Sequence, residues 1–115
     1  MCDRAKLNNI LNIMQRKAKE IFREKLDSVI LYGSYARGDY DDDSDIDIMI
    51  VVDMDKNNLI DYRKPIYKVA HDVGYENDVM VSPHIQDKET FEKFSDVVPF
   101  YKNVKEEGVY TNAKQ

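Results

Sequence analysis

The apolar residues of this chain recur with two different periods, and each period predicts a different kind of element. Over residues 7–22 they recur every three to four positions, as on one face of an amphipathic helix. Residues 28–32 and 46–52 are short, nearly continuous apolar runs, which is typical of strands covered on both faces. The first half of the chain therefore predicts a helix packed on a buried sheet.

The second half of the chain returns to helical spacing over residues 59–73. Pro65 interrupts this stretch, so the helix either begins near Arg63 or is kinked there. A third short strand and two further helices complete the pattern: residues 78–81, 87–94 and 99–107. Asp87 is a candidate cap for the first of these helices. The predicted fold class is α/β (α+β), a small mixed β-sheet flanked by helices.

The composition is that of a globular protein. The chain has 115 residues, of which 43% are hydrophobic and 34% are charged, and we expect one domain over residues 1–115. The formal net charge of −5 repels nucleic acid unless a metal or a local basic patch intervenes. The single cysteine, Cys2, forms no disulfide within the chain, and the sequence shows no signal segment or membrane-length apolar run. We therefore expect a cytoplasmic protein without a membrane partner.

Residues 33–38, Gly-Ser-Tyr-Ala-Arg-Gly, follow the first predicted strand and have the composition of a phosphate-binding turn. Gly33 allows the backbone to approach a ligand closely. Ser34 supplies a hydroxyl and a backbone N–H, and a short helix beginning there would direct its first N–H groups at an anion. Arg37 lies one turn further on and can bind a phosphate oxygen, although a surface ion pair is an alternative role for it.

Asp45 and Asp47 open the second predicted strand and are candidate metal ligands. Side chains at i and i+2 of a strand project from the same face, so both carboxylates can reach one ion or a pair of ions. Two neighbouring carboxylates resist joint ionisation, and a bound Mg²⁺, which prefers oxygen ligands, removes this conflict. Asp78, at the start of the third predicted strand, is a candidate third carboxylate, and a capping or turn residue is the alternative.

Two common ion- and phosphate-binding motifs do not account for this segment. Residues 33–38 have the glycine spacing that opens a P-loop, but Asp39 and Tyr40 stand where lysine and Ser/Thr are required. Three aspartates at alternate positions in the following loop resemble the start of an EF-hand. However, Ile46 and Val52 replace its turn glycine and its closing glutamate. The remaining aspartates of the loop are therefore interpreted as a solvated acidic turn.

The order Gly33-Ser34, ten residues, then Asp45-x-Asp47 resembles the Gly-Ser-x10-Asp-x-Asp signature of the DNA polymerase β-like nucleotidyltransferase superfamily. The Gly-Ser-Tyr-Ala-Arg-Gly segment and the small size are most similar to the minimal nucleotidyltransferases, the MntA-like antitoxins. The resemblance extends in element order from the first helix to the strand at Asp78, and it is loose after about residue 86.

The resemblance implies a role for each matched residue. The Gly-Ser pair would hold the β- and γ-phosphates of the substrate ATP, and the two carboxylates of Asp-x-Asp would bind two Mg²⁺ ions. Asp78 would bind one of these ions and help to deprotonate the attacking hydroxyl, and Arg37 would contact phosphate. The implied reaction is in-line attack on the α-phosphorus of ATP with release of pyrophosphate.

The resemblance also implies a partner. In similar systems AMP is added to a tyrosine of a paired HEPN-domain ribonuclease toxin, and this addition silences the toxin. A chain of 115 residues has no room for an acceptor domain, so another chain or a second copy of this one is expected to complete the acceptor site. Two other functions remain open. One is the catalytic subunit of a two-chain nucleotidyltransferase acting on a small hydroxyl compound such as an aminoglycoside. The other is a non-catalytic module that neutralises a toxin by docking.

Overall fold

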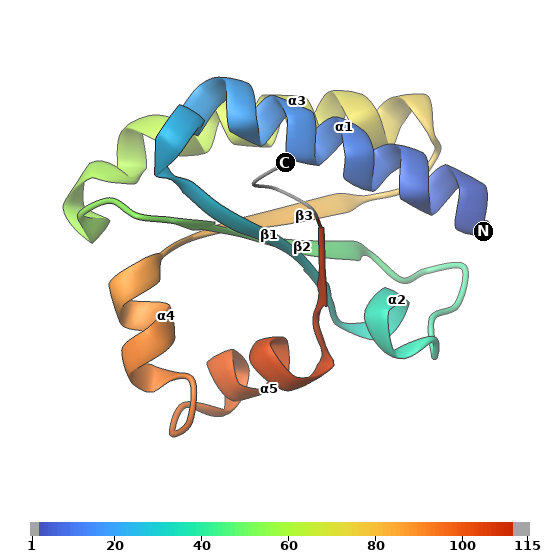
Figure 1. Cartoon of the computed structure of the whole chain (residues 1–115). Helices are drawn as coiled ribbons and strands as arrows, with labels where there is room; N and C mark the ends of the chain where they lie inside the picture. Colours follow the sequence, from blue (N-terminus) through green and yellow to red (C-terminus); the bar gives the residue numbers. More distant parts are fainter. Residues whose placement is uncertain (1–2, 112–115) are drawn as a thin grey trace.

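A mixed four-stranded β-sheet forms the centre of the computed structural model, which describes residues 3–111 (Figure 1). The strands are β1 (Leu26–Tyr32), β2 (Ile46–Val52), β3 (Val81–Asp87) and β4 (Val109–Tyr110). They lie in the order β3-β2-β1-β4, with β1 antiparallel to β2 and to β4, and with β2 parallel to β3. The predicted mixed sheet is confirmed, and β4 is a short strand that the apolar pattern did not indicate.

Helices cover both faces of the sheet (Figure 1). One face carries α1 (Arg4–Phe22) and α3 (Ile60–Glu76), and the other carries α4 (Lys88–Phe94) and α5 (Pro99–Glu107). Short helical segments join these elements: η1 (Arg23–Lys25), α2 (Ser34–Arg37) and η2 (Lys56–Asn58). Among residues 3–111, no helix combines the length and the apolar character that a membrane crossing requires.

The side chains of β2 alternate between the two helical layers. Ile48 and Ile50 belong to the larger core under α1 and α3, whereas Met49 and Val51 belong to a second core under α4 and α5. Both cores exclude water, which is why this strand is apolar without a break from Ile48 to Val52. Asp47 shares the parity of Met49 and therefore lies at the open end of the α4–α5 face.

The predicted start of the third strand at Asp78 is wrong. The strand β3 begins at Val81, where the predicted strand ended, and continues through Pro83 to Asp87. A proline is tolerated there because β3 is the edge of the sheet, and the outer side of an edge strand needs no N–H donor. Apolar character alone could not locate this strand, because His84 and Gln86 interrupt its sequence.

The helices largely follow their sequence signals. The carboxylate of Asp87 accepts a hydrogen bond of 2.9 Å from the backbone N–H of Thr90, which confirms Asp87 as the N-cap of α4. The helix α3 begins at Ile60 rather than near Arg63, and it contains the exposed Pro65 within its second turn. A proline near the start of a helix costs few backbone hydrogen bonds, so the apolar face of α3 determines where the helix begins.

Candidate active site

The turn after β1 brings backbone and carboxylate together. Gly33 has a φ of +75°, a conformation that residues with a Cβ rarely adopt. A Cβ atom on this residue would also collide with the carboxylate of Asp47. Glycine is therefore needed here for two reasons, and the turn lies directly against one of the two predicted metal ligands.

A short helix, α2, begins at Ser34 directly after this turn, which is the arrangement considered from the sequence. The N–H groups of Ala36 and Arg37 both donate to the carbonyl of Gly33 at 3.1 Å, and the N–H of Gly38 donates to the carbonyl of Ser34 at 2.9 Å. The N–H of Ser34 precedes the first of these intrahelical bonds and lies at the positive end of the helix. This placement fits the predicted contact of Ser34 with phosphate.

The predicted metal pair lies at the start of β2. Asp45 is exposed and precedes the strand, whereas Asp47 is half-buried and pairs with Tyr32 across the β1–β2 ladder. Burial and the charge of Asp45 raise the pKa of Asp47, and the charge of Arg37 lowers it. Burial and the charge of Asp47 raise the pKa of Tyr32 to about 12.

These charges fit a bound cation. A raised carboxyl pKa means that the surrounding protein compensates the negative charge of Asp47 incompletely, so a divalent cation would relieve its repulsion with Asp45. Residues 3–111 contain no group of three or more His, Cys, Asp or Glu side chains placed to hold one ion. The pair would therefore rely on substrate phosphates and water for the remaining ligands, as Mg²⁺ commonly does.

Arg37 forms surface ion pairs, which is the alternative role that the sequence left open for it. Its Nε lies 3.2 Å from a carboxylate oxygen of Asp39, and its Nη1 lies 3.4 Å from a carboxylate oxygen of Glu107. Hydrogen bonds to these two carboxylates raise the pKa of the guanidinium. Arg37 is nevertheless near enough to lower the pKa of Asp47, so contact with a phosphate bound at this site stays a prediction.

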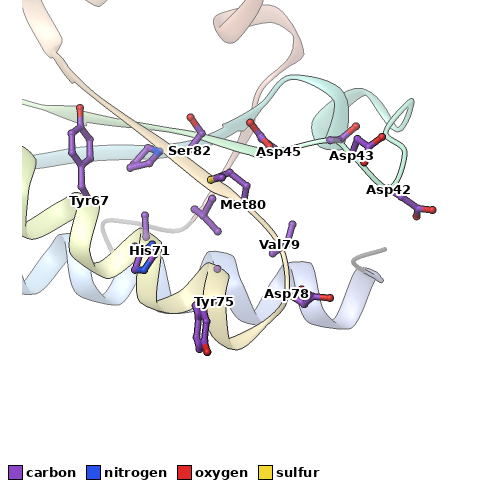
Figure 2. Close-up of a pocket in the computed structure, with 15 residues that line it drawn as sticks. Asp42, Asp43, Asp45, Tyr67, His71, Tyr75, Asp78, Val79, Met80 and Ser82 are labelled. Atoms are coloured by element: carbon purple, nitrogen blue, oxygen red, sulfur yellow. The ribbon is translucent and has the colours of Figure 1, made fainter.

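The structure does not bring Asp78 together with Asp45 and Asp47. Asp78 lies in the turn after α3 with a φ of +54°, and its N–H donates to the carbonyl of Tyr75 at 3.4 Å. Figure 2 shows it at the end of α3, across a groove from Asp45. This is the position of a turn residue, the alternative that the sequence left open.

Strand register places other side chains beside the metal pair. Tyr32 on β1 and Ser82 on β3 flank Asp47 at the same level of the sheet. The ring of Phe100 from α5 contacts those of Tyr32 and His84, with centroids 5.7 and 5.6 Å away. Sequence reasoning missed Ser82 and Phe100, because no motif marks them and only strand pairing and helix packing bring them here.

Two hollows lie near the pair. A cavity of about 340 Å³ lies beside Gly33 and Arg37 and is closed by α5 residues, including Phe100 and Glu107. A larger groove of about 1060 Å³ lies along the start of β3 and includes Asp45 (Figure 2). Asp45 therefore borders the groove, whereas Asp47 lies near the cavity through its contact with Gly33.

Comparison with known proteins agrees with this arrangement. The family model of the nucleotidyltransferase domain matches residues 9–111. Two proteins of Methanocaldococcus jannaschii, each carrying the name "putative protein adenylyltransferase", are 37% and 38% identical to this chain. The first alignment covers 80% of this chain and 91% of the relative, and the second covers 78% and 82%.

A solved structure supports the fold. A crystal structure described as a toxin-antitoxin with AMP-PNP superposes with a TM-score of 0.50 and 21% identity, covering 88% of this chain and 74% of the other. At this identity the match shows a shared fold. The family model and the two archaeal relatives show that this chain belongs to the nucleotidyltransferase domain family and is a nucleotidyltransferase.

Proposed function

We propose that this chain transfers AMP from ATP to a tyrosine hydroxyl of a paired HEPN-domain toxin and thereby acts as its antitoxin. The observation that carries the proposal is the contact between the Asp47 carboxylate and the Gly33 backbone, because it joins the predicted phosphate turn to the predicted metal pair. The names of the two archaeal relatives support a protein as the acceptor. The resemblance of the Gly-Ser and Asp-x-Asp motif to the MntA-like antitoxins suggests the toxin.

Different residues of the site bind different parts of the ATP–Mg²⁺ complex. Gly33 and Ser34 hold the β- and γ-phosphates through the backbone and the serine hydroxyl. Arg37 releases one of its ion-pair partners and binds a phosphate oxygen instead. Asp45 and Asp47 hold Mg²⁺, with two ions expected. Bound Mg²⁺ supplies positive charge that stabilises the attacking and leaving oxygens. Because Asp78 lies across the groove, we leave it out of this ligand set.

The reaction exchanges one phosphorus–oxygen bond for another. The acceptor oxygen forms a bond to the α-phosphorus, and the bond from that phosphorus to the oxygen bridging to the β-phosphate breaks. AMP stays on the acceptor, pyrophosphate leaves with the electron pair of the broken bond, and the hydroxyl proton passes to solvent or to a carboxylate of the pair. The attacking and leaving oxygens lie in line on opposite sides of the phosphorus, so the acceptor approaches from the side opposite the departing pyrophosphate.

The first test is the intact mass of the neighbouring gene product after co-expression with this chain. A second culture carries the double variant Asp45→Asn/Asp47→Asn. A third carries Asp53→Asn/Asp96→Asn, which removes the same charge from exposed carboxylates outside the motif. We expect mass increments of whole AMP units with the wild type and with the third culture, and none with the motif variant. Fragmentation then locates the modified tyrosine.

Two outcomes would favour the alternatives. An unmodified partner that still co-purifies with the wild type and the motif variant, and is neutralised by both, would indicate a non-catalytic binding module. Transfer of AMP only to a small hydroxyl compound such as an aminoglycoside, with no protein modified, would indicate the small-molecule enzyme. Either result would reject protein AMP transfer as the function of this chain.

A further inference from the structure

The larger groove reaches Asp45 from the β3 side of the sheet, whereas the predicted phosphate turn follows β1. The sheet order places β1 on one side of β2 and β3 on the other. Gly33 follows β1, whereas the groove follows the start of β3 and has Asp45 at its rim (Figure 2). In-line transfer needs the acceptor to enter opposite the leaving phosphates. An acceptor bound in the groove would reach Asp45 from the β3 side, away from the turn after β1.

The walls of this groove expose large apolar side chains. Tyr75 is 84% exposed, Met80 is 64% exposed and Tyr67 is 50% exposed. Tyr67 and Tyr75 lie two turns apart on α3, and Met80 lies in the segment that leads into β3 (Figure 2). A group of such side chains on one hollow is typical of a surface that contacts another molecule.

The charge of the groove is one-sided. Its fifteen lining residues all belong to the described part of the chain. They include four aspartates and no lysine or arginine. The carboxylates of Asp43 and Asp45 border one side, and that of Asp78 borders the other (Figure 2). An acidic hollow on a chain of net charge −5 attracts cationic partners and repels acidic ones.

We propose that this groove, with Tyr67, Tyr75, Met80 and Asp43 as its principal contacts, binds a basic segment of the acceptor protein and delivers its tyrosine to Asp45. The inference rests on the proposed function and adds the chemistry of the acceptor to it. A volume of about 1060 Å³ lies at the upper limit of small-molecule sites, which are roughly 300–1,000 Å³. An extended peptide with apolar and basic side chains fits both the size and the exposed apolar wall.

The groove would recognise this segment through its side chains and not by pairing it as an added β-strand. The free edge of β3 borders the groove, but Pro83 supplies no N–H to a peptide added along that edge. Recognition then depends on the apolar contacts of the α3 wall and on the aspartates. Substitution of exposed groove residues outside the metal pair can therefore test the proposal.

The test uses short fluorescein-labelled peptides that carry one tyrosine flanked by lysine and arginine. Matched peptides carry glutamate at the flanking positions, and kanamycin serves as a polycationic small molecule. Fluorescence anisotropy measures peptide binding, and mass spectrometry measures AMP transfer with Mg²⁺ and ATP. We expect the basic peptide to bind at least about tenfold more tightly than the acidic one and to be the better acceptor.

Two variants of the groove are compared with one matched control. Tyr75→Ser/Met80→Ser removes exposed apolar side chains, and Asp43→Lys reverses a charge. Each should weaken binding of the basic peptide about tenfold or more. The control Ile60→Ser/Val97→Ser removes side chains that are 65% and 71% exposed but lie outside the groove, and it should bind the peptide as the wild type does.

The thermal shift with Mg²⁺ and ATP separates this inference from the proposed function. All of these proteins should retain that shift, because none of the changed residues lies in the nucleotide site. Equal binding of basic and acidic peptides, unchanged binding by both groove variants, or AMP transfer to kanamycin with none to peptide would overturn the basic-segment proposal while the shift persists. Absence of the shift in the wild type would instead reject the proposed function itself.

Discussion

The carboxylate of Asp47 lies against the backbone of Gly33, where any Cβ atom on residue 33 would collide with it. The antiparallel ladder between β1 and β2 creates this contact, because it sets Tyr32, the residue before the glycine, opposite Asp47. The predicted phosphate turn and the predicted metal pair therefore meet at one level of the sheet. A change at either residue should disturb the binding of both phosphate and metal.

Substitution of Gly33 by alanine should damage activity more than stability. Its φ of +75° and ψ of −155° cost an alanine about 1–3 kcal/mol of unfolding free energy, and the new Cβ also displaces the Asp47 carboxylate. We expect turnover to fall by about a hundredfold or more. Gly38→Ala is the matched control, because Gly38 has a φ of +87° and open space at its Cβ position. Urea unfolding should show the larger destabilisation at residue 33, where the clash adds to the backbone cost, and AMP transfer should show a large loss only there.

Mg²⁺ and ATP together should stabilise the folded chain. A site that exists only in the folded state shifts the melting temperature by roughly 5 °C or more when ligand exceeds its Kd about a hundredfold. ATP with a chelator should give a much smaller shift, because the carboxylates of Asp45 and Asp47 then repel the phosphates. Differential scanning fluorimetry measures both. Equal shifts with and without metal would contradict the metal pair.

The stability of the apoprotein should depend on pH through the carboxyl group of Asp47. Its folded-state pKa is raised from 3.8 by burial and by Asp45, so the protonated form is favoured by folding. This contribution is present below the ordinary aspartate pKa and is lost as pH rises through the folded pKa. In EDTA at neutral pH, Asp47→Asn should therefore melt on the order of 2 °C above the wild type. The difference should vanish in acid, and saturating Mg²⁺ should reverse it; a variant less stable than the apoprotein at neutral pH would contradict this account.

Replacement of Asp78 by asparagine should leave turnover within about twofold of the wild type. The residue lies outside the metal pair, and asparagine tolerates its φ of +54° better than most residues. Steady-state kinetics at saturating ATP and Mg²⁺ measure the effect, with Asp47→Asn as the inactive reference. A loss comparable to that of the reference would return Asp78 to the ligand set and imply that the turn after α3 closes over the groove.

Arg37 should contribute to nucleotide binding rather than to folding. Its ion pairs with Asp39 and Glu107 are exposed, so Arg37→Gln should barely change the melting temperature. If the guanidinium contacts phosphate, the KM for ATP should rise about tenfold, and Arg37→Lys should recover only part of the loss because lysine cannot bind an oxygen pair bidentately. An unchanged KM in Arg37→Gln would assign the residue to its surface ion pairs alone.

Much of this architecture follows from local sequence. The strand β2 spans residues 46–52 as its apolar run predicted, and Asp87 caps α4 as its position before a helical pattern predicted. The Gly-Ser and Asp-x-Asp spacing resembles the family signature, and the match to the family model confirms the family. The periodicity, the caps and the motif are each contained in a few neighbouring residues, so each can be recognised without the fold.

The sequence by itself determined the fold class, the family and the residues that meet at Gly33 and Asp47. Tertiary structure decided which residues surround them: it placed Ser82 beside Asp47, left Asp78 across a groove, and carried β3 through Pro83. The physical reason is strand register. A partner on a neighbouring strand is set by the packing of whole layers, since a shift of one residue moves every side chain to the opposite face.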